Sequence, residues 1–155
     1  MPPVSITQAK LESDMALVKG LFIEYAASIG IDLEYQGFSA ELEGLPGKYA
    51  PPGDLLIASV NGEAVGCVAL RALGPATLEM KRLYVRSAVR GMGIGKRLVE
   101  AAIDSARQHG YKELRLDTLA TMAAAQAVYR SLGFVEIPAY GDAYLPGTRF
   151  YALPL

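Results

Sequence analysis

Residues 79–97, EMKRLYVRSAVRGMGIGKR, decide the fold, because they lead from a strand-like run through a turn with three glycines into a predicted helix. Within residues 90–95, several backbone N–H groups can converge on an anion at the positive end of the helix dipole. Arg90, Lys96 and Arg97 add positive charge that suits a pyrophosphate and a further phosphate better than a carboxylate. The turn therefore predicts a site for a phosphate-bearing ligand. A glycine-rich turn without a ligand is the alternative.

The strand-like run over Thr77–Val85 changes the phase of its apolar residues. Leu78 and Met80 mark one face, whereas Leu83 and Val85 lie one residue out of step. Because side chains alternate between the two faces of a strand, one extra residue near positions 81–82 returns all four to the same face. The pattern thus predicts a β-bulge.

Two familiar nucleotide-binding motifs are excluded by the spacing of the turn. A phosphate loop of the Walker A type requires glycine where this chain has Arg90, and Ser or Thr where it has Arg97. A Rossmann fingerprint requires G-x-G-x-x-G in a strand–helix–strand unit, whereas these glycines are spaced G-x-G-x-G and follow a hairpin. Another class of phosphate-bearing ligand is expected.

The composition favours one domain over residues 1–155 that binds a small molecule. The 155 residues, 52% of them hydrophobic, are enough for one core. The net charge of −1 lacks the one-sided excess of proteins that bind nucleic acids or anionic membranes. Cys67 is the single cysteine, so an internal disulfide is impossible, and no stretch has signal or membrane-span character. We expect a cytoplasmic location.

Hydrophobic periodicity predicts an α/β fold with a mixed sheet and helices on both faces. Asn61-Gly62 predicts a type I′ hairpin turn, and Ser13 and Gly30 are the expected ends of the first helix. Strands are predicted at Val4–Ala9, Leu55–Val60, Glu63–Leu70, Thr77–Val85, Leu114–Asp117, Phe134–Ile137 and Thr148–Leu153. Helices are predicted at Leu11–Ile29, Ser39–Leu45, Gly93–His109 and Met122–Leu132.

The chain resembles the GNAT superfamily of acyl-CoA-dependent N-acyltransferases over about residues 54–137. Residues 90–95 satisfy the family signature of Arg or Gln, two variable residues, Gly, one variable residue, then Gly or Ala. Tyr129 and Gly133-Phe134 match the second motif, although Met122 stands where many members have Asn. The resemblance implies a mixed, mostly antiparallel sheet with a bulged fourth strand and an N-acetyltransferase that uses acetyl-CoA without a metal. It implies cofactor contacts from Leu83, Tyr84, Val85, Arg90, Gly91, Met92, Gly93, Ile94, Gly95 and Lys96.

The resemblance also suggests the groups that move protons. Direct attack of a primary amine on a thioester requires a base, an oxyanion donor and an acid for the thiolate. Tyr129 is the candidate acid, with a core-filling role as the alternative. Glu79 is the candidate base, with a salt-bridged strand residue as the alternative, and Asp117 is a weaker candidate. His109 and Cys67 are expected to cap a helix and to pack, respectively.

The acceptor is expected to be a small molecule, amino acid or peptide bound across the sheet from the cofactor. An acidic stretch without a basic residue would suit a cationic amine, and a solvated loop is the alternative. The acidic stretch comprises Asp32, Glu34, Glu41 and Glu43. The tyrosines expected to line the acceptor pocket are Tyr25, Tyr35, Tyr140 and Tyr144. A CoA-binding or regulatory module without turnover, and a structural phosphate-binding domain, are the competing functions. The final strands make a homodimer plausible.

Overall fold

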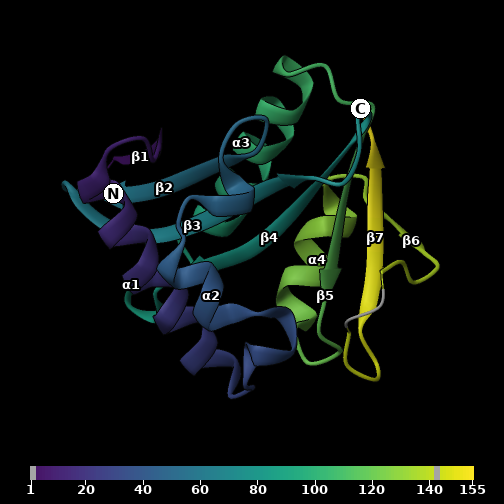
Figure 1. The fold of residues 1–155 in the computed structure, drawn as a ribbon, viewed down its shortest axis with the longest axis horizontal. Coiled ribbons are helices and arrows are strands. Elements are labelled where there is room, and N and C mark those ends of the chain that lie inside the picture. Colours follow the sequence, from purple (N-terminus) through teal and green to yellow (C-terminus); the bar gives the residue numbers. More distant parts are fainter. Residues whose placement is uncertain (1–2, 142–143) are drawn as a thin grey trace.

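One mixed sheet organises the protein in the computed structural model, which describes residues 3–141 and 144–155 (Figure 1). Across these residues the strand order is β1-β2-β3-β4-β5-β7-β6, and every neighbouring pair is antiparallel except β4 and β5. This arrangement confirms the expected mixed, mostly antiparallel sheet. The strands are β1 (Val4–Gln8), β2 (Asp54–Val60), β3 (Glu63–Ala72), β4 (Thr77–Val85), β5 (Glu113–Thr118), β6 (Val135–Ile137) and β7 (Arg149–Pro154).

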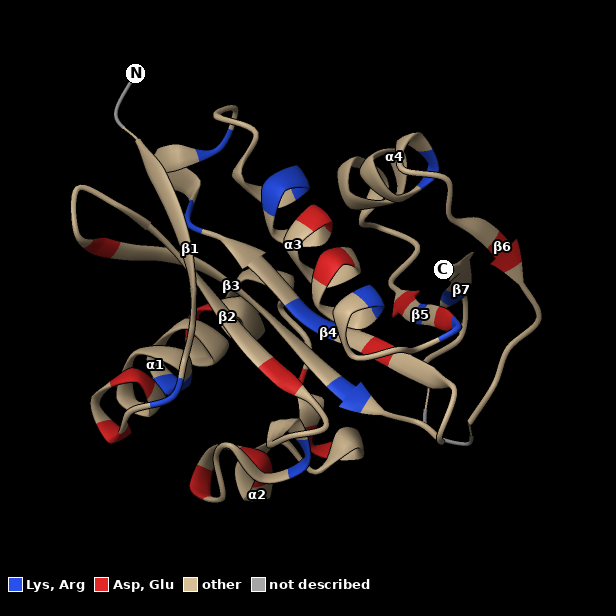
Figure 2. Cartoon of the chain, turned by 90° about the horizontal axis from the view of Figure 1, so that it is seen from above, with Lys and Arg blue, Asp and Glu red and all other residues tan. Residues whose placement is uncertain are grey.

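Helices cover both faces of the sheet, with α3 and α4 on one side and α1 and α2 on the other (Figure 2). Alternation along β2 separates the two cores, because Leu56 and Ala58 pack toward α3 whereas Leu55 and Ile57 pack toward α1. The helices are α1 (Glu12–Ile29), α2 (Phe38–Glu43), α3 (Ile94–Gln108) and α4 (Ala123–Ser131). Short 3₁₀ turns occur at Leu33–Gln36, Gly47–Tyr49 and Ser87–Val89.

The local signals at element ends are confirmed except at the start of α1. Asn61 and Gly62 have φ values of 52° and 79°, as a type I′ turn requires. Gly30 ends α1 with φ 66°. The prediction that Ser13 caps α1 is wrong: the Asp14 carboxylate accepts the Leu11 N–H at 3.0 Å and caps the helix from its first turn.

The predicted bulge in β4 is confirmed. Cys67 and Ala69 of β3 are two residues apart but pair with Tyr84 and Lys81, which are three apart. Arg82 lies within this interval with φ 62°, a conformation that non-glycine residues rarely adopt. The extra residue turns the four apolar side chains of β4 toward one core, as the phase change predicted.

Beyond the first half of β4, the sheet opens. The parallel ladder with β5 runs from Thr77↔Glu113 to Met80↔Leu116 and ends there, although β4 continues to Val85. Figure 1 shows β4 and β5 together near the top of the molecule and diverging toward the bottom. In the part of the chain that the structure describes, the β4 backbone groups that point toward β5 after Met80 have no ladder partner. This splay creates the candidate site.

Candidate active site

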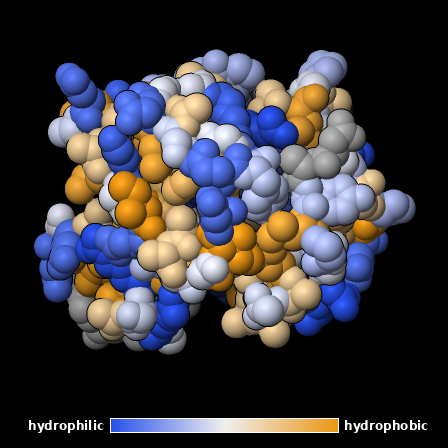
Figure 3. Space-filling view, turned by 60° about the horizontal axis from the view of Figure 1, so that its bottom comes forward, coloured by the Kyte–Doolittle hydropathy of each residue, from blue (hydrophilic) through white to orange (hydrophobic). Residues whose placement is uncertain are grey.

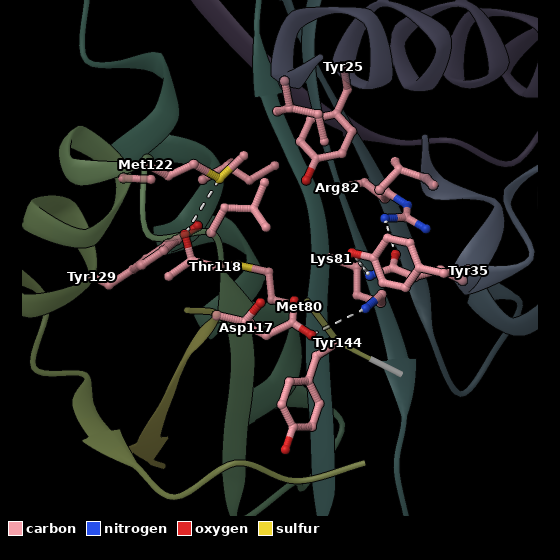
Figure 4. Close-up of a pocket in the computed structure, with 17 residues that line it drawn as sticks. Tyr25, Tyr35, Met80, Lys81, Arg82, Asp117, Thr118, Met122, Tyr129 and Tyr144 are labelled. Carbon is pink, nitrogen blue, oxygen red and sulfur yellow. Dashed lines mark hydrogen bonds and ion pairs between the residues drawn. The ribbon is translucent and has the colours of Figure 1, made fainter. Parts of the chain in front are cut away.

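A narrow cavity of about 60 Å³ passes through the splay between β4 and β5. Met122, Ala125 and Tyr129 reach it from α4, on one face of the sheet. From the other face, α1 and the turn that follows contribute Tyr25 and Tyr35, as Figure 4 shows. Such a passage has room for reacting groups rather than for a whole ligand. Its lining side chains come from both faces of the sheet.

The glycine turn has the geometry of an anion site. Gly91 and Gly93 have φ values of 88° and 76°, which favour glycine. Gly93 is the N-cap of α3, and no described side chain caps the helix. The first intrahelical bond runs from the Arg97 N–H to the Gly93 oxygen at 3.1 Å, so the N–H groups of residues 94–96 remain available. The described turn fits a phosphate-bearing cofactor.

The free edge of β4 runs from the cavity to this turn. Leu83 lines the cavity, and Val85 lies two residues further along the strand. A Cβ on Gly95 would lie 3.8 Å from Val85 Cγ2, so the end of the strand contacts the first turn of α3. Arg90 adds a second link, because its Nε donates to the Val85 oxygen at 3.1 Å. An elongated ligand can lie along this edge with its phosphates at the turn.

Tyr129 packs in the core and also lines the cavity. Its ring packs in the core, with its centroid 5.8 Å from that of Phe134 and 6.2 Å from that of Tyr151. The same side chain lines the cavity, where Figure 4 shows it beside Met122 on the α4 side. Burial raises the pKa of the Tyr129 phenol above its ordinary value, so the hydroxyl keeps its proton. A protonated phenol at this position can act as an acid.

Glu79 is buried and held by three neighbours. Its carboxylate pairs with Arg71 Nε at 2.7 Å and Lys81 Nζ at 3.6 Å, and it accepts the Tyr140 hydroxyl at 2.7 Å. Burial acts to raise the pKa of Glu79, but these cations and hydrogen bonds together hold it below its usual range. The structure thus places Glu79 in an ion-pair network, where its affinity for a proton is reduced.

Asp117 has the opposite electrostatic environment. It lies at the end of β5 and lines the cavity opposite the bulged strand. Burial raises the pKa of Asp117, and Lys81, whose Nζ lies 3.9 Å away, only partly offsets this effect. A carboxylate with a raised pKa accepts a proton more readily, so this site favours Asp117 over Glu79 as a base.

A second cavity of about 450 Å³ adjoins the first on the α2 side of the sheet. Gln36, Lys81 and Asp117 line both cavities and form their shared wall. The remaining lining residues are Lys48, Arg71, Leu73, Glu79, Arg115, Tyr140 and Gly141. On the face shown in Figure 3, hydrophobic side chains gather across the lower middle, with hydrophilic groups above them and to either side.

Three of the four acidic residues of the predicted acidic surface make contacts within the chain. Asp32 accepts the Glu34 N–H at 2.9 Å, and Glu34 accepts the Ser39 N–H at 2.9 Å. Glu41 pairs with Lys48 at 3.2 Å and also with the arginine of the bulge. Of these three carboxylates, Glu41 is the one that the described ion pairs match with basic side chains, and the acidic surface for a cationic amine stays a prediction. The expectation for the tyrosines holds better, because Tyr25, Tyr35 and Tyr144 line the first cavity and Tyr140 lines the second.

Arg82 was missed as a structural residue by the sequence reasoning. Its Nε and Nη2 donate to the two carboxylate oxygens of Glu41, both at 3.0 Å, and its Nη1 donates to Gln36 Oε1 at 2.7 Å. Arg82 is 4% exposed, and it joins the bulge to the segment that contains Gln36 and Glu41. The only signal in the sequence was the position of this arginine at the phase break.

His109 and Cys67 have the roles expected of them. His109 ends α3, with its Nδ1 2.7 Å from the Ser105 oxygen. Cys67 is buried beside the bulge, and burial raises the pKa of its thiol, which opposes formation of a nucleophilic thiolate. Residues 3–141 and 144–155 contain no cluster of three or more His, Cys, Asp or Glu suited to a metal ion. No helix within these ranges is long and apolar enough to cross a membrane.

The bulged strand, the splayed sheet and the glycine turn together define an acyltransferase type of fold. The chain belongs to the acetyltransferase (GNAT) family, whose model matches residues 24–134. An uncharacterized N-acetyltransferase from Schizosaccharomyces pombe is 38% identical and aligns over 98% of this chain and 95% of its own length. Rat N-acetylaspartate synthetase is 39% identical over 63% of this chain, which is 33% of the rat protein.

The fold is also shared with a solved structure of a Salmonella typhimurium protein, a putative acetyltransferase with its cofactor acetyl-CoA. The TM-score is 0.74 at 19% identity, and the alignment covers 97% of this chain and 93% of that chain. This likeness concerns the fold.

Proposed function

We propose that this GNAT acetyltransferase, as a single domain over residues 1–155, transfers the acetyl group of acetyl-CoA to a primary amine by direct attack. The observation that carries this proposal is the passage through the splay, joined by the free edge of β4 to the glycine turn. This arrangement lets a donor on the α3 and α4 side meet an acceptor on the α1 and α2 side. The Salmonella structure with acetyl-CoA supports the choice of donor.

The donor site is formed by the chain from Leu83 to Lys96. The free N–H groups of residues 94–96 and the cations of Arg90 and Lys96 would hold the phosphates. Backbone groups of Leu83, Tyr84 and Val85 would pair with the pantetheine arm, and a free N–H there would polarise the thioester carbonyl. When bound, acetyl-CoA supplies the thioester whose carbonyl carbon the amine attacks.

Two side chains move the protons. Asp117 takes a proton from the amine nitrogen, directly or through water, as the nitrogen–carbon bond forms. Tyr129 gives its phenolic proton to the sulfur as the carbon–sulfur bond breaks. The resemblance predicts Glu79 as the base. In this scheme Glu79 has a positioning role instead, because its carboxylate forms ion pairs with Arg71 and Lys81.

A CoA-binding module without turnover is the second candidate. Met122 favours it, because a thioether lines the cavity where many family members place an amide side chain. In that case Tyr129 would serve only as a core residue beside Phe134 and Tyr151.

Binding and turnover with matched glycine variants test the proposal. We expect acetyl-CoA to raise the melting temperature and to release thiol when an amine is present. Gly93→Glu should abolish the shift, because it places a bulky anion at the phosphate turn. Gly30→Glu is the control: Gly30 also has positive φ and open surroundings but ends α1. If millimolar acetyl-CoA gives no shift with the unchanged protein, the proposal fails; binding without thiol release across a broad amine panel supports the non-catalytic module.

A further inference from the structure

Basic side chains outnumber acidic ones among the residues that line the second cavity. Its lining includes four basic side chains and two acidic ones. Arg71, Glu79 and Arg115 lie side by side on β3, β4 and β5, because Glu79 is in register with both arginines. The central carboxylate is occupied by Arg71, Lys81 and the Tyr140 hydroxyl, and Arg115 pairs with Glu113 instead.

Arg71 and Arg115 each have N–H donors that remain available for a ligand. Arg71 uses Nε to bind Glu79, and Arg115 uses Nε to bind Glu113 at 2.7 Å. A guanidinium has five N–H donors. The terminal nitrogens, Nη1 and Nη2, of these two arginines make no hydrogen bond to a side chain among the described residues. Planar guanidinium groups with open terminal nitrogens are suited to a carboxylate ligand.

The Arg115 guanidinium is held in place by an aromatic residue. Its central carbon lies 5.2 Å from the centre of the Tyr140 ring. That ring packs against Phe150 with 5.0 Å between centroids, and its hydroxyl is anchored on Glu79. A guanidinium restrained before the ligand arrives loses less entropy on binding. The Arg115 side chain, which is 33% exposed, is therefore restrained before a ligand binds.

We propose that the second cavity binds a carboxylate of the acceptor, so that the substrate is an amine that also bears a carboxylate, as an amino acid does. This inference rests on the proposed function. Arg71 and Arg115 bind the carboxylate through their terminal nitrogens. The amine then lies at the shared wall with the first cavity, where Asp117 accepts its proton.

Paired acceptors test the inference in the intact protein. We expect glycine, β-alanine, L-aspartate or L-glutamate to be acetylated with kcat/KM at least about tenfold above that of the corresponding amides, the effect of one charge-assisted contact. Arg115→Gln should raise the KM of the preferred acid at least about tenfold, with a smaller change in kcat and little effect on the amide. Arg149→Gln is the matched control, because Arg149 is also a strand arginine paired with one glutamate but lines neither cavity.

The outcomes separate the two proposals. Equal rates for acids and amides, or preference for a diamine, would overturn the carboxylate site and leave the transferase intact. If acetyl-CoA neither binds nor turns over, the proposed transferase function is wrong. Succinate binding, measured by calorimetry, then still tests whether the second cavity binds a carboxylate. Succinate binding that Arg115→Gln weakens at least about tenfold, with Arg149→Gln unchanged, supports the anion site. Absence of succinate binding at millimolar concentration, together with no preference for acids, overturns it.

Discussion

Replacing Glu41 by Gln should destabilise the protein strongly, because it leaves Arg82 buried without its counter-ion. The side chains of this ion pair are 3% and 5% exposed, and both carboxylate oxygens accept from the guanidinium. Glutamine keeps the shape but removes the negative charge and directs an NH₂ group toward one guanidinium nitrogen. The remaining Gln36 contact neutralises no charge.

The magnitude follows from the burial of the pair. Removing one partner of a buried ion pair costs about 3–5 kcal/mol, which corresponds to a fall of about 6–20 °C in melting temperature for a domain of this size. Lys48, also paired with Glu41, is 35% exposed at its side chain, so water replaces much of that contact. Arg82→Met combined with Glu41→Met should recover most of the loss, because neither charge then remains buried.

Thermal unfolding followed by circular dichroism measures this effect. Glu136→Gln is the control, since its pair with Arg149 is about half exposed and its loss should change stability by at most about 1 kcal/mol. Equal melting temperatures for Glu41→Gln and Glu136→Gln would refute the reasoning. The dependence of stability on pH gives a second test, because its direction follows from the pKa shift of Glu41. Burial tends to raise the pKa of Glu41, but Arg82 and Lys48 lower it overall, so the stabilisation is present above about pH 4.3 and is lost as pH falls through the lower folded-state pKa.

The other predictions concern the proton-transfer groups. Tyr129→Phe should lower kcat by about 10²–10⁴-fold with little change in acetyl-CoA affinity or melting temperature, and unchanged kcat would remove Tyr129 as the acid. Asp117→Asn should lower kcat by a similar factor of about 10²–10⁴ and abolish the acid limb of the kcat–pH profile, which in the unchanged protein should lie above the ordinary Asp pKa of about 3.9. If Asp117→Asn retains that limb and Glu79→Gln loses it, Glu79 is the base.

Local patterns were sufficient to predict much of the fold. The bounds Thr77–Val85 of β4 agree with the structure, and its bulge followed from the phase of four apolar residues, because the period of a strand is fixed at two. The Asn61-Gly62 turn was equally predictable, since two successive positive φ values strongly favour this pair. Each of these features depends on neighbours in sequence.

The site was less predictable because its key contacts are distant in sequence. Arg82 and Glu41 are 41 residues apart, and Glu79 and Tyr140 are 61 apart. Whether Asp117 or Glu79 is the better proton acceptor depends on how burial and nearby cations shift the pKa of each carboxyl group. The spacing of residues along the chain does not reveal these shifts. Whether the acidic stretch can bind a cation also depends on partners distant in sequence, as the ion pair of Glu41 with Arg82 shows.

The bulge connects stability to chemistry. One extra residue in β4 directs Arg82 into a buried ion pair on the α2 side and sets the register of the strand edge that leads to the glycine turn. Gln36, which accepts from Arg82, also lines both cavities. A change at Glu41 therefore reaches the acceptor wall through Arg82 and Gln36, without any contact between Glu41 and the reacting atoms. Well below its melting transition, Glu41→Gln should consequently weaken acceptor binding more than acetyl-CoA binding, because the glycine turn is built on α3 and does not depend on this pair.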